Sequence, residues 1–135
     1  MEIIKVLFVC VENACRSQMA EGFAKKLGKG KVEAYSAGSR PSGTVSPQAI
    51  AVMKEIGIDI SKQRSKGFGD IPHPQFDYVI TLGCQDVCPF FPSREAVTWQ
   101  IPDPKDKTLN EFRRTRDLIK LKVRELLERI ELGDI

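Results

Sequence analysis

The stretch Cys10-Val11-Glu12-Asn13-Ala14-Cys15-Arg16-Ser17 decides the fold, because it separates two segments of different pattern. Residues 3–9 before it form an apolar run typical of a buried strand, and residues 19–27 after it have a helical pattern. In a loop between a strand and a helix, free N–H groups converge on one point, and the helix N-terminus adds partial positive charge there. The stretch therefore predicts an oxyanion-binding loop over residues 11–17.

Two side chains of this loop carry reactive chemistry. A thiol at position 10 should lose its proton easily, because the loop dipoles and the Arg16 guanidinium both favour the thiolate. Arg16 presents a planar fork of donors that suits two oxygens of a tetrahedral oxyanion. We therefore expect Cys10 to act as a nucleophile on the central atom of a phosphate-like ion, with Arg16 as the clamp.

The rest of the chain alternates strands with helices. Strands are expected at residues 31–36, 76–82 and 96–101, and helices from residue 47 to Gly57 and from 108 to 132. This order predicts an α/β fold, with residues 1–135 as one domain: a three-layer sandwich whose four-stranded parallel sheet has helices on both faces. Ligands of such sheets bind beyond the carboxyl ends of the strands, where Cys10, Gly83-Cys84 and Asp103 all fall.

The composition excludes several classes of function. The chain has 135 residues, 41% of them hydrophobic and 29% charged, as in an ordinary globular protein. Its net charge of +3 is too small to argue for nucleic acid or membrane as a partner. Since no signal peptide or membrane span is visible, we expect a cytoplasmic protein whose four cysteines are reduced at rest.

The Cys-x5-Arg-Ser loop after an N-terminal strand resembles the low-molecular-weight protein tyrosine phosphatases and the arsenate reductases built on the same fold. Further landmarks of that family occur in family order along nearly the whole chain: Ser17-Gln18-Met19-Ala20-Glu21-Gly22, Tyr35-Ser36-Ala37-Gly38, Thr81-Leu82-Gly83-Cys84, Cys88-Pro89 and Asp103-Pro104.

The resemblance implies roles for several residues. Asn13 should occupy a turn with positive φ that aims the loop amides inward, and asparagine tolerates that conformation. Ser17 should donate a hydrogen bond to the Cys10 thiolate, whereas Cys15 should only be a packed residue. Asp103 lies where the phosphatases keep a general acid, although an aspartate before proline is also a common turn residue.

Glu12 departs from the family pattern, because many relatives have glycine at this place. A carboxylate beside an oxyanion pocket repels the ligand, so the Glu12 side chain is expected to point outward to solvent. If it does not, tight anion binding is in doubt.

Two more cysteines distinguish the two halves of the family. A phosphatase needs one cysteine and water, whereas a reductase needs further thiols to release arsenite and be reduced again. The resemblance implies attack of Cys10 on arsenate, then of Cys84 on the Cys10 adduct, then of Cys88 on Cys84. Lys105 and Asp106 stand where phosphatases have aromatic residues, which also favours arsenate reduction over the alternative, a tyrosine phosphatase.

The electron donor stays open between thioredoxin and a low-molecular-weight thiol. Thioredoxin-coupled relatives usually separate the last two cysteines by seven positions, whereas Cys84 and Cys88 are four apart. On a helix this puts their Cα atoms about 6 Å apart, just inside the range of a disulfide. No bound cofactor is expected, and phosphate or sulfate should mimic the substrate arsenate.

Some relatives hold a potassium ion beside the loop. Three of its four ligand positions match here, at Asn13, Glu21 and Ser36, but the fourth position is Lys66 in place of aspartate. Two interpretations of Lys66 stand equally: its ammonium occupies the place of the ion, or it is a solvated loop lysine.

A zinc site made of the four cysteines, at positions 10, 15, 84 and 88, is a distant alternative. The spacings are not the usual Cys-x2-Cys pairs, and Arg16 would stand against the metal. The single histidine, His73, lies between two prolines and is expected on a surface loop, so a Cys–His catalytic pair is disfavoured.

Overall fold

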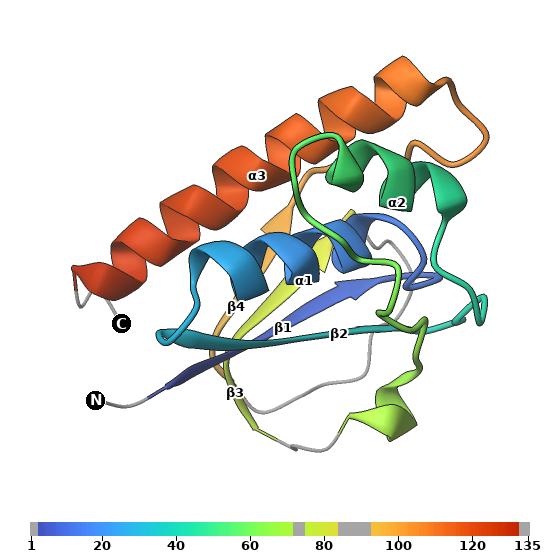
Figure 1. The fold of residues 1–135 in the computed structure, drawn as a ribbon. Helices are drawn as coiled ribbons and strands as arrows, with labels where there is room; N and C mark the ends of the chain where they lie inside the picture. Colours follow the sequence, from blue (N-terminus) through green and yellow to red (C-terminus); the bar gives the residue numbers. More distant parts are fainter. Residues whose placement is uncertain (1–2, 72–74, 84–92, 133–135) are drawn as a thin grey trace.

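The computed structural model describes residues 3–71, 75–83 and 93–132. Figure 1 shows the elements in this part of the chain, which follow one another as β1 (Ile4–Cys10), α1 (Arg16–Leu27), β2 (Val32–Gly38), α2 (Pro47–Lys54), the 3-10 helix η1 (Phe68–Asp70), β3 (Phe76–Leu82), β4 (Ser93–Trp99) and α3 (Leu109–Glu131). The predicted alternation of strands and helices is confirmed.

The strands form one parallel sheet in the order β2-β1-β3-β4. Its register aligns the carboxyl ends of the strands, because Cys10 pairs with Gly38 and Leu82 pairs with Trp99. The chain moves from β1 to one side for β2 and to the other side for β3. Parallel sheets bind ligands at such a reversal, and here it lies at the end of β1, beside Cys10.

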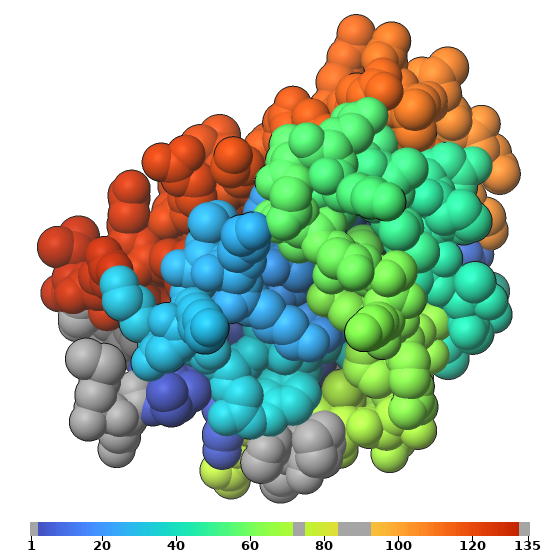
Figure 2. Space-filling model, in the orientation of Figure 1, coloured from blue at the N-terminus to red at the C-terminus, as the bar shows by residue number. Residues whose placement is uncertain are grey.

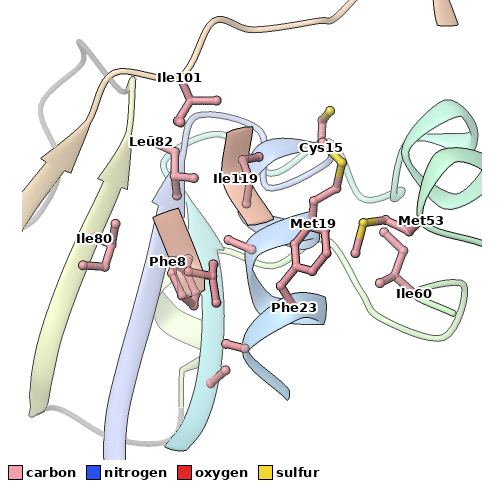
Figure 3. Packing of buried hydrophobic residues seen from close by; sticks show 14 of the residues in the cluster. Phe8, Cys15, Met19, Phe23, Met53, Ile60, Ile80, Leu82, Ile101 and Ile119 are labelled. Carbon is pink, nitrogen blue, oxygen red and sulfur yellow. The ribbon is translucent and has the colours of Figure 1, made fainter. Parts of the chain in front are cut away.

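The two faces of the sheet are covered unequally. One face, with Val6 and Phe8 of β1, shares a single hydrophobic cluster with all three α-helices. Figure 3 shows Phe8 in this cluster together with Phe23 of α1 and Ile119 of α3. On the opposite face, a smaller cluster around Leu7 and Val9 packs against hydrophobic side chains of η1 and its neighbours. In the described residues, the three α-helices therefore lie on one face of the sheet, and the opposite face meets only η1 and the residues beside it.

The caps and faces of the helices follow from the sequence. The Ser46 hydroxyl caps α2 by accepting a hydrogen bond from the Ala49 N–H over 3.2 Å, and Pro47 occupies the first turn. The Thr108 hydroxyl caps α3 in the same way. Helix α3 buries one apolar stripe, Phe112, Ile119, Val123 and Leu126.

Helices α2 and α3 are joined by a buried arginine. Arg116 of α3 donates to the Val52 carbonyl and to the Glu55 carboxylate over 2.9 and 2.8 Å. In Figure 2 the green residues of α2 and the orange first turns of α3 pack side by side on the visible face. This contact fixes the position of α2 against α3. The N-terminal end of α2 borders the cleft described below.

The boundary of the last strand differs from the prediction. Residues 96–101 were expected to form it, but β4 is Ser93–Trp99, and Ile101 lies beyond its end. Ile101 is 3% exposed although it is not part of the strand, so its apolar side chain misplaced the predicted boundary. Within the described ranges, no helix combines the length and the apolar character needed to cross a membrane.

Candidate active site

The predicted loop connects β1 directly to α1. Strand β1 ends at Cys10, α1 begins at Arg16, and Asn13 between them has a φ of +49°. This is the positive φ expected for Asn13. The turn is packed tightly against β2, because a Cβ at Gly38 would stand 2.4 Å from the Val11 carbonyl oxygen and 2.8 Å from the Asn13 nitrogen. The loop therefore requires glycine at position 38.

A buried network holds the nucleophile. The Cys10 sulfur lies 2.9 Å from the Ser17 hydroxyl oxygen, and the Asn13 side-chain amide donates to that same oxygen over 2.7 Å. The proton of Ser17 is therefore free to be donated to the sulfur, because the hydroxyl oxygen already accepts one from Asn13. The network thus holds the Cys10 sulfur in place with the Ser17 hydroxyl directed at it.

The orientation of Asn13 is itself determined by its neighbours. Its side-chain oxygen accepts from the Gln18 side-chain amide over 2.9 Å and from the Lys66 N–H over 2.8 Å. Gln18 in turn accepts from the Gln63 side-chain amide over 2.8 Å. Sequence reasoning gave no role to either glutamine, because no local pattern links positions 18 and 63.

Arg16 is buried and is held by residues that follow β4. One guanidinium nitrogen donates to the Ile101 carbonyl over 2.9 Å, and the other lies 3.6 Å from the Asp103 carboxylate. Gly83 lies directly against the guanidinium, since a Cβ there would be 2.5 Å from Arg16 Nη1. The ends of β1, β3 and β4 thus meet at Arg16, as the strand order predicts.

The position of Asp103 bears on the two roles considered for it. Its side chain is 49% exposed, lies within ion-pair distance of Arg16, and lines the cleft that contains Cys10. Its other oxygen accepts a hydrogen bond from the Lys105 N–H over 3.0 Å, which is the usual behaviour of a turn aspartate. The turn therefore places a partly exposed carboxylate on the nucleophile's cleft.

Glu12 is neither buried nor free in solvent. Its side chain is 36% exposed, lines the same cleft, and lies 2.5 Å from the Lys105 ammonium. The sequence led us to expect a carboxylate directed away into solvent. The structure shows an ion pair at the rim of the cleft.

Cys15 packs into the core, as expected. It is 8% exposed and belongs to the large hydrophobic cluster, where Figure 3 shows it close to Met19. Burial raises the pKa of the Cys15 thiol, and the proximity of Cys10 raises it further. Cys15 is therefore a poor nucleophile beside a reactive one.

The remaining cysteines, Cys84 and Cys88, and the single histidine, His73, lie outside the described residues. Gly83 precedes Cys84 directly, so the chain enters the cysteine segment from a point beside Arg16. Among the described residues, no group of three or more histidine, cysteine, aspartate or glutamate side chains is placed to hold a metal. The hypothesis of a four-cysteine zinc site stays untested, because two of its cysteines are not described.

The predicted cation-site residues lie together behind the loop. Glu21 is 4% exposed and accepts a hydrogen bond from the Ser36 hydroxyl. The Lys66 ammonium lies 3.6 Å from Glu21 Oε1 and 3.4 Å from Ser36 Oγ, and it donates to the Arg64 carbonyl over 2.9 Å. Burial lowers the pKa of Lys66, while the Glu21 carboxylate opposes that shift. The Lys66 backbone N–H donates to the Asn13 side-chain oxygen over 2.8 Å.

Cys10, Glu12, Arg16 and Asp103 line one cleft of about 510 Å³, which the N-terminal end of α2 also borders. Its lining includes Cys10, Arg16 and Asp103 together with Ser42, Thr44 and Ser46. The cleft therefore brings together the thiol predicted to be the nucleophile, the guanidinium predicted to be the clamp, and a partly exposed carboxylate. This is a site for attack on a tetrahedral oxyanion.

Comparison with known proteins places this site in a family. The family model for low molecular weight phosphotyrosine protein phosphatase matches residues 5–133. The glutaredoxin arsenate reductase of Synechocystis sp. is 45% identical over 129 residues, which cover 93% of this chain and 98% of the relative. Arsenate reductase 2 of Staphylococcus epidermidis is 44% identical over 119 residues, which cover 85% and 89% of the two chains.

Solved structures agree with these relatives. One described as an arsenate reductase in the phosphate binding state has a TM-score of 0.86 and 44% identity, covering 95% of this chain and 99% of the other. A thioredoxin-dependent arsenate reductase of Corynebacterium glutamicum has a TM-score of 0.80 and 34% identity, covering 97% of this chain and 63% of the other. The chain therefore belongs to the low molecular weight phosphotyrosine protein phosphatase family, in the group that contains the arsenate reductases.

Proposed function

We propose that this protein is an arsenate reductase that works in the cytoplasm, where its thiols are kept reduced. The observation that carries the proposal is the position of the Cys10 thiol, which lies 2.9 Å from the Ser17 hydroxyl oxygen. At the end of the same loop, Arg16 is buried and held by its hydrogen bond to the Ile101 carbonyl. Relatives that share this loop and most of the chain are named arsenate reductases.

The first step is attack of the Cys10 thiolate on arsenic(V). The loop amides and Arg16 bind the remaining oxygens, and one arsenate oxygen leaves as water after protonation, giving a Cys10–arsenic(V) thioester. Asp103 relays the proton to the leaving oxygen, since its carboxylate is exposed to solvent and lines the cleft of Cys10.

The second step transfers the electrons. The Cys84 thiolate attacks the Cys10 sulfur, a Cys10–Cys84 disulfide forms, and the sulfur–arsenic bond breaks with its electron pair on arsenic. Arsenic(V) is thereby reduced to arsenic(III), which leaves as arsenite. The two thiols supply the two electrons.

The third step regenerates the enzyme. The Cys88 thiolate attacks Cys84 and releases Cys10, leaving a Cys84–Cys88 disulfide that an external thiol reduces. The thiol donor is thioredoxin or a low-molecular-weight thiol. The Corynebacterium protein is described as thioredoxin-dependent, whereas the Synechocystis protein carries glutaredoxin in its name.

We further propose that Lys66 takes the place of a monovalent cation behind the loop. Its ammonium lies against Glu21 and Ser36, while its backbone N–H fixes Asn13 at 2.8 Å. Glu21 also pairs with Lys25, whose ammonium lies 2.5 Å from Glu21 Oε2, so Lys66 is a second cation beside this buried carboxylate. Through its backbone N–H, Lys66 also orients the amide that holds Ser17.

The experiment that tests the function compares two reactions of the purified protein. Arsenite formation from arsenate is measured with reduced thioredoxin and, separately, with a low-molecular-weight thiol, and hydrolysis of an aryl phosphate is measured in parallel. Cys10→Ser should abolish both activities. Efficient aryl phosphate turnover without arsenite formation would establish the second candidate, a tyrosine phosphatase, for which Cys10, Arg16 and Asp103 also suffice. Weak phosphatase activity beside arsenate reduction is expected, because the anion site is shared.

A further inference from the structure

Glu12 poses an electrostatic problem for this site. Its backbone is fixed, because its carbonyl accepts hydrogen bonds from the Ser42 N–H over 3.0 Å and from the Ser65 hydroxyl over 2.9 Å. The side chain therefore projects from an immobile point of the oxyanion loop into the cleft that it lines with Cys10. A carboxylate there repels a divalent anion unless another charge neutralises it.

Lys105, which lines the same cleft, provides that charge. Its ammonium lies 2.5 Å from Glu12 Oε2, although the two residues are 93 positions apart in the sequence. The Glu12 carboxylate raises the pKa of Lys105, so the lysine stays charged throughout the neutral range. Lys105 is itself positioned by its backbone N–H, which donates to Asp103 Oδ1 over 3.0 Å.

The exposure of the Glu12–Lys105 pair indicates that it acts on ligand binding rather than on stability. The Lys105 and Glu12 side chains are 55% and 36% exposed, and ion pairs in such positions contribute little to stability. Their effect on an incoming dianion is different, because it depends on the net charge at the rim of the cleft. Removing one partner changes that net charge by a full unit.

We propose that Lys105 is a specificity-determining residue that keeps Glu12 neutralised and so sets the affinity of the Cys10 loop for divalent oxyanions. The inference rests on the proposed function only for the identity of the substrate. Binding of inorganic phosphate reports on the same loop without any turnover.

The test uses three variants of the full chain: Lys105→Met, Glu12→Gln and the double variant. Phosphate dissociation constants are measured by calorimetry, and kcat/KM for arsenate is measured in parallel. Lys105→Met leaves Glu12 unpaired, so phosphate affinity and kcat/KM should each fall about fivefold. Glu12→Gln leaves Lys105 free to face the anion, so both should rise by a similar factor. The double variant should lie within about twofold of the unmodified protein.

The two single variants are expected to change phosphate affinity in opposite directions. This distinguishes charge compensation from a purely structural contact. If the pair merely ties the Cys10 loop to the turn that carries Lys105, both single variants lose affinity and the double variant recovers nothing, and that result would overturn the proposal. Unchanged affinity in both single variants would overturn it as well. The backbone bond from Lys105 to Asp103 is present in all the variants, so the turn itself is not altered.

Lys31→Met is the matched control. Lys31 makes a comparably exposed ion pair with Glu131, with side-chain exposures of 45% and 50%, next to the opposite end of β2 from the cleft. This variant should leave phosphate affinity unchanged. Raising the salt concentration to about 1 M, where the Debye length is about 3 Å, should reduce the differences among the cleft variants. If the unmodified protein binds phosphate but makes no arsenite, the proposed function fails while the comparison of phosphate affinities still decides the role of Lys105.

Discussion

Replacement of Gly83 by alanine tests how Arg16 is held. Gly83 has a φ of +72°, and an added Cβ would lie 2.5 Å from Arg16 Nη1 and 2.8 Å from the Ile101 carbonyl oxygen. Carbon contacts are comfortable at about 3.5 Å, so the guanidinium must move by about 1 Å. That displacement breaks the 2.9 Å hydrogen bond from Arg16 to Ile101 and misplaces the donors that face the oxyanion.

The expected magnitudes follow from these changes. An alanine at positive φ costs about 1 kcal/mol, and the lost hydrogen bond costs about another 1 kcal/mol. The free energy of unfolding of Gly83→Ala should therefore fall by about 2 kcal/mol in urea denaturation. A misplacement of about 1 Å at a catalytic clamp reduces the rate by up to about 100-fold, so kcat/KM for arsenate should fall by about 10- to 100-fold.

Gly30→Ala is the matched control for this prediction. Gly30 has a φ of +84°, but no atom lies within 4 Å of the position of an added Cβ. This variant should lose only the strain energy of about 1 kcal/mol and should keep its full kcat/KM. The argument is refuted if Gly83→Ala retains normal kcat/KM and phosphate affinity, or if Gly30→Ala loses activity to the same extent.

The remaining predictions concern the relay, the cation site and the contact between two helices. Cys84→Ser should form the arsenic adduct but release no arsenite, and Cys88→Ser should accumulate a Cys10–Cys84 disulfide, visible by mass spectrometry. Normal thioredoxin-dependent cycling of Cys88→Ser would exclude the three-cysteine relay. Potassium should raise the melting temperature no more than sodium does, whereas Lys66→Asp should create a potassium dependence; potassium-specific stabilisation of the unmodified protein would contradict the proposed ammonium. Arg116→Met breaks the bonds to Glu55 and Val52 and should cost about 2 to 3 kcal/mol in urea denaturation, with kcat/KM unchanged.

The sequence predicted the parts of this molecule that depend on local pattern. Apolar runs, helix caps and glycines located the strands and helices, and the Cys-x5-Arg spacing located the loop before any tertiary contact was known. The positive φ of Asn13 followed from its residue type and the family pattern. These features are encoded within a few residues, so pattern analysis finds them.

The contacts that orient the site are not encoded in this way. Arg16 is held by a backbone carbonyl 85 positions away, and Glu12 by a lysine 93 positions away. A carbonyl has no sequence signature, and Lys105 was noted only because it is not aromatic. The end of β4 was also placed wrongly, because burial of Ile101 beyond the strand imitates a strand residue.

One measurement tests the central claim, that Cys10 starts a reaction in which thiols reduce arsenic(V). The fully reduced protein is mixed with one equivalent of arsenate in the absence of any external reductant, and both arsenite and protein thiols are counted. One arsenite should appear per protein chain, with loss of two thiols and formation of one disulfide, and Cys10→Ser should give neither. Release of arsenite without loss of thiols, or no arsenite from a protein that hydrolyses an aryl phosphate efficiently, would contradict the account.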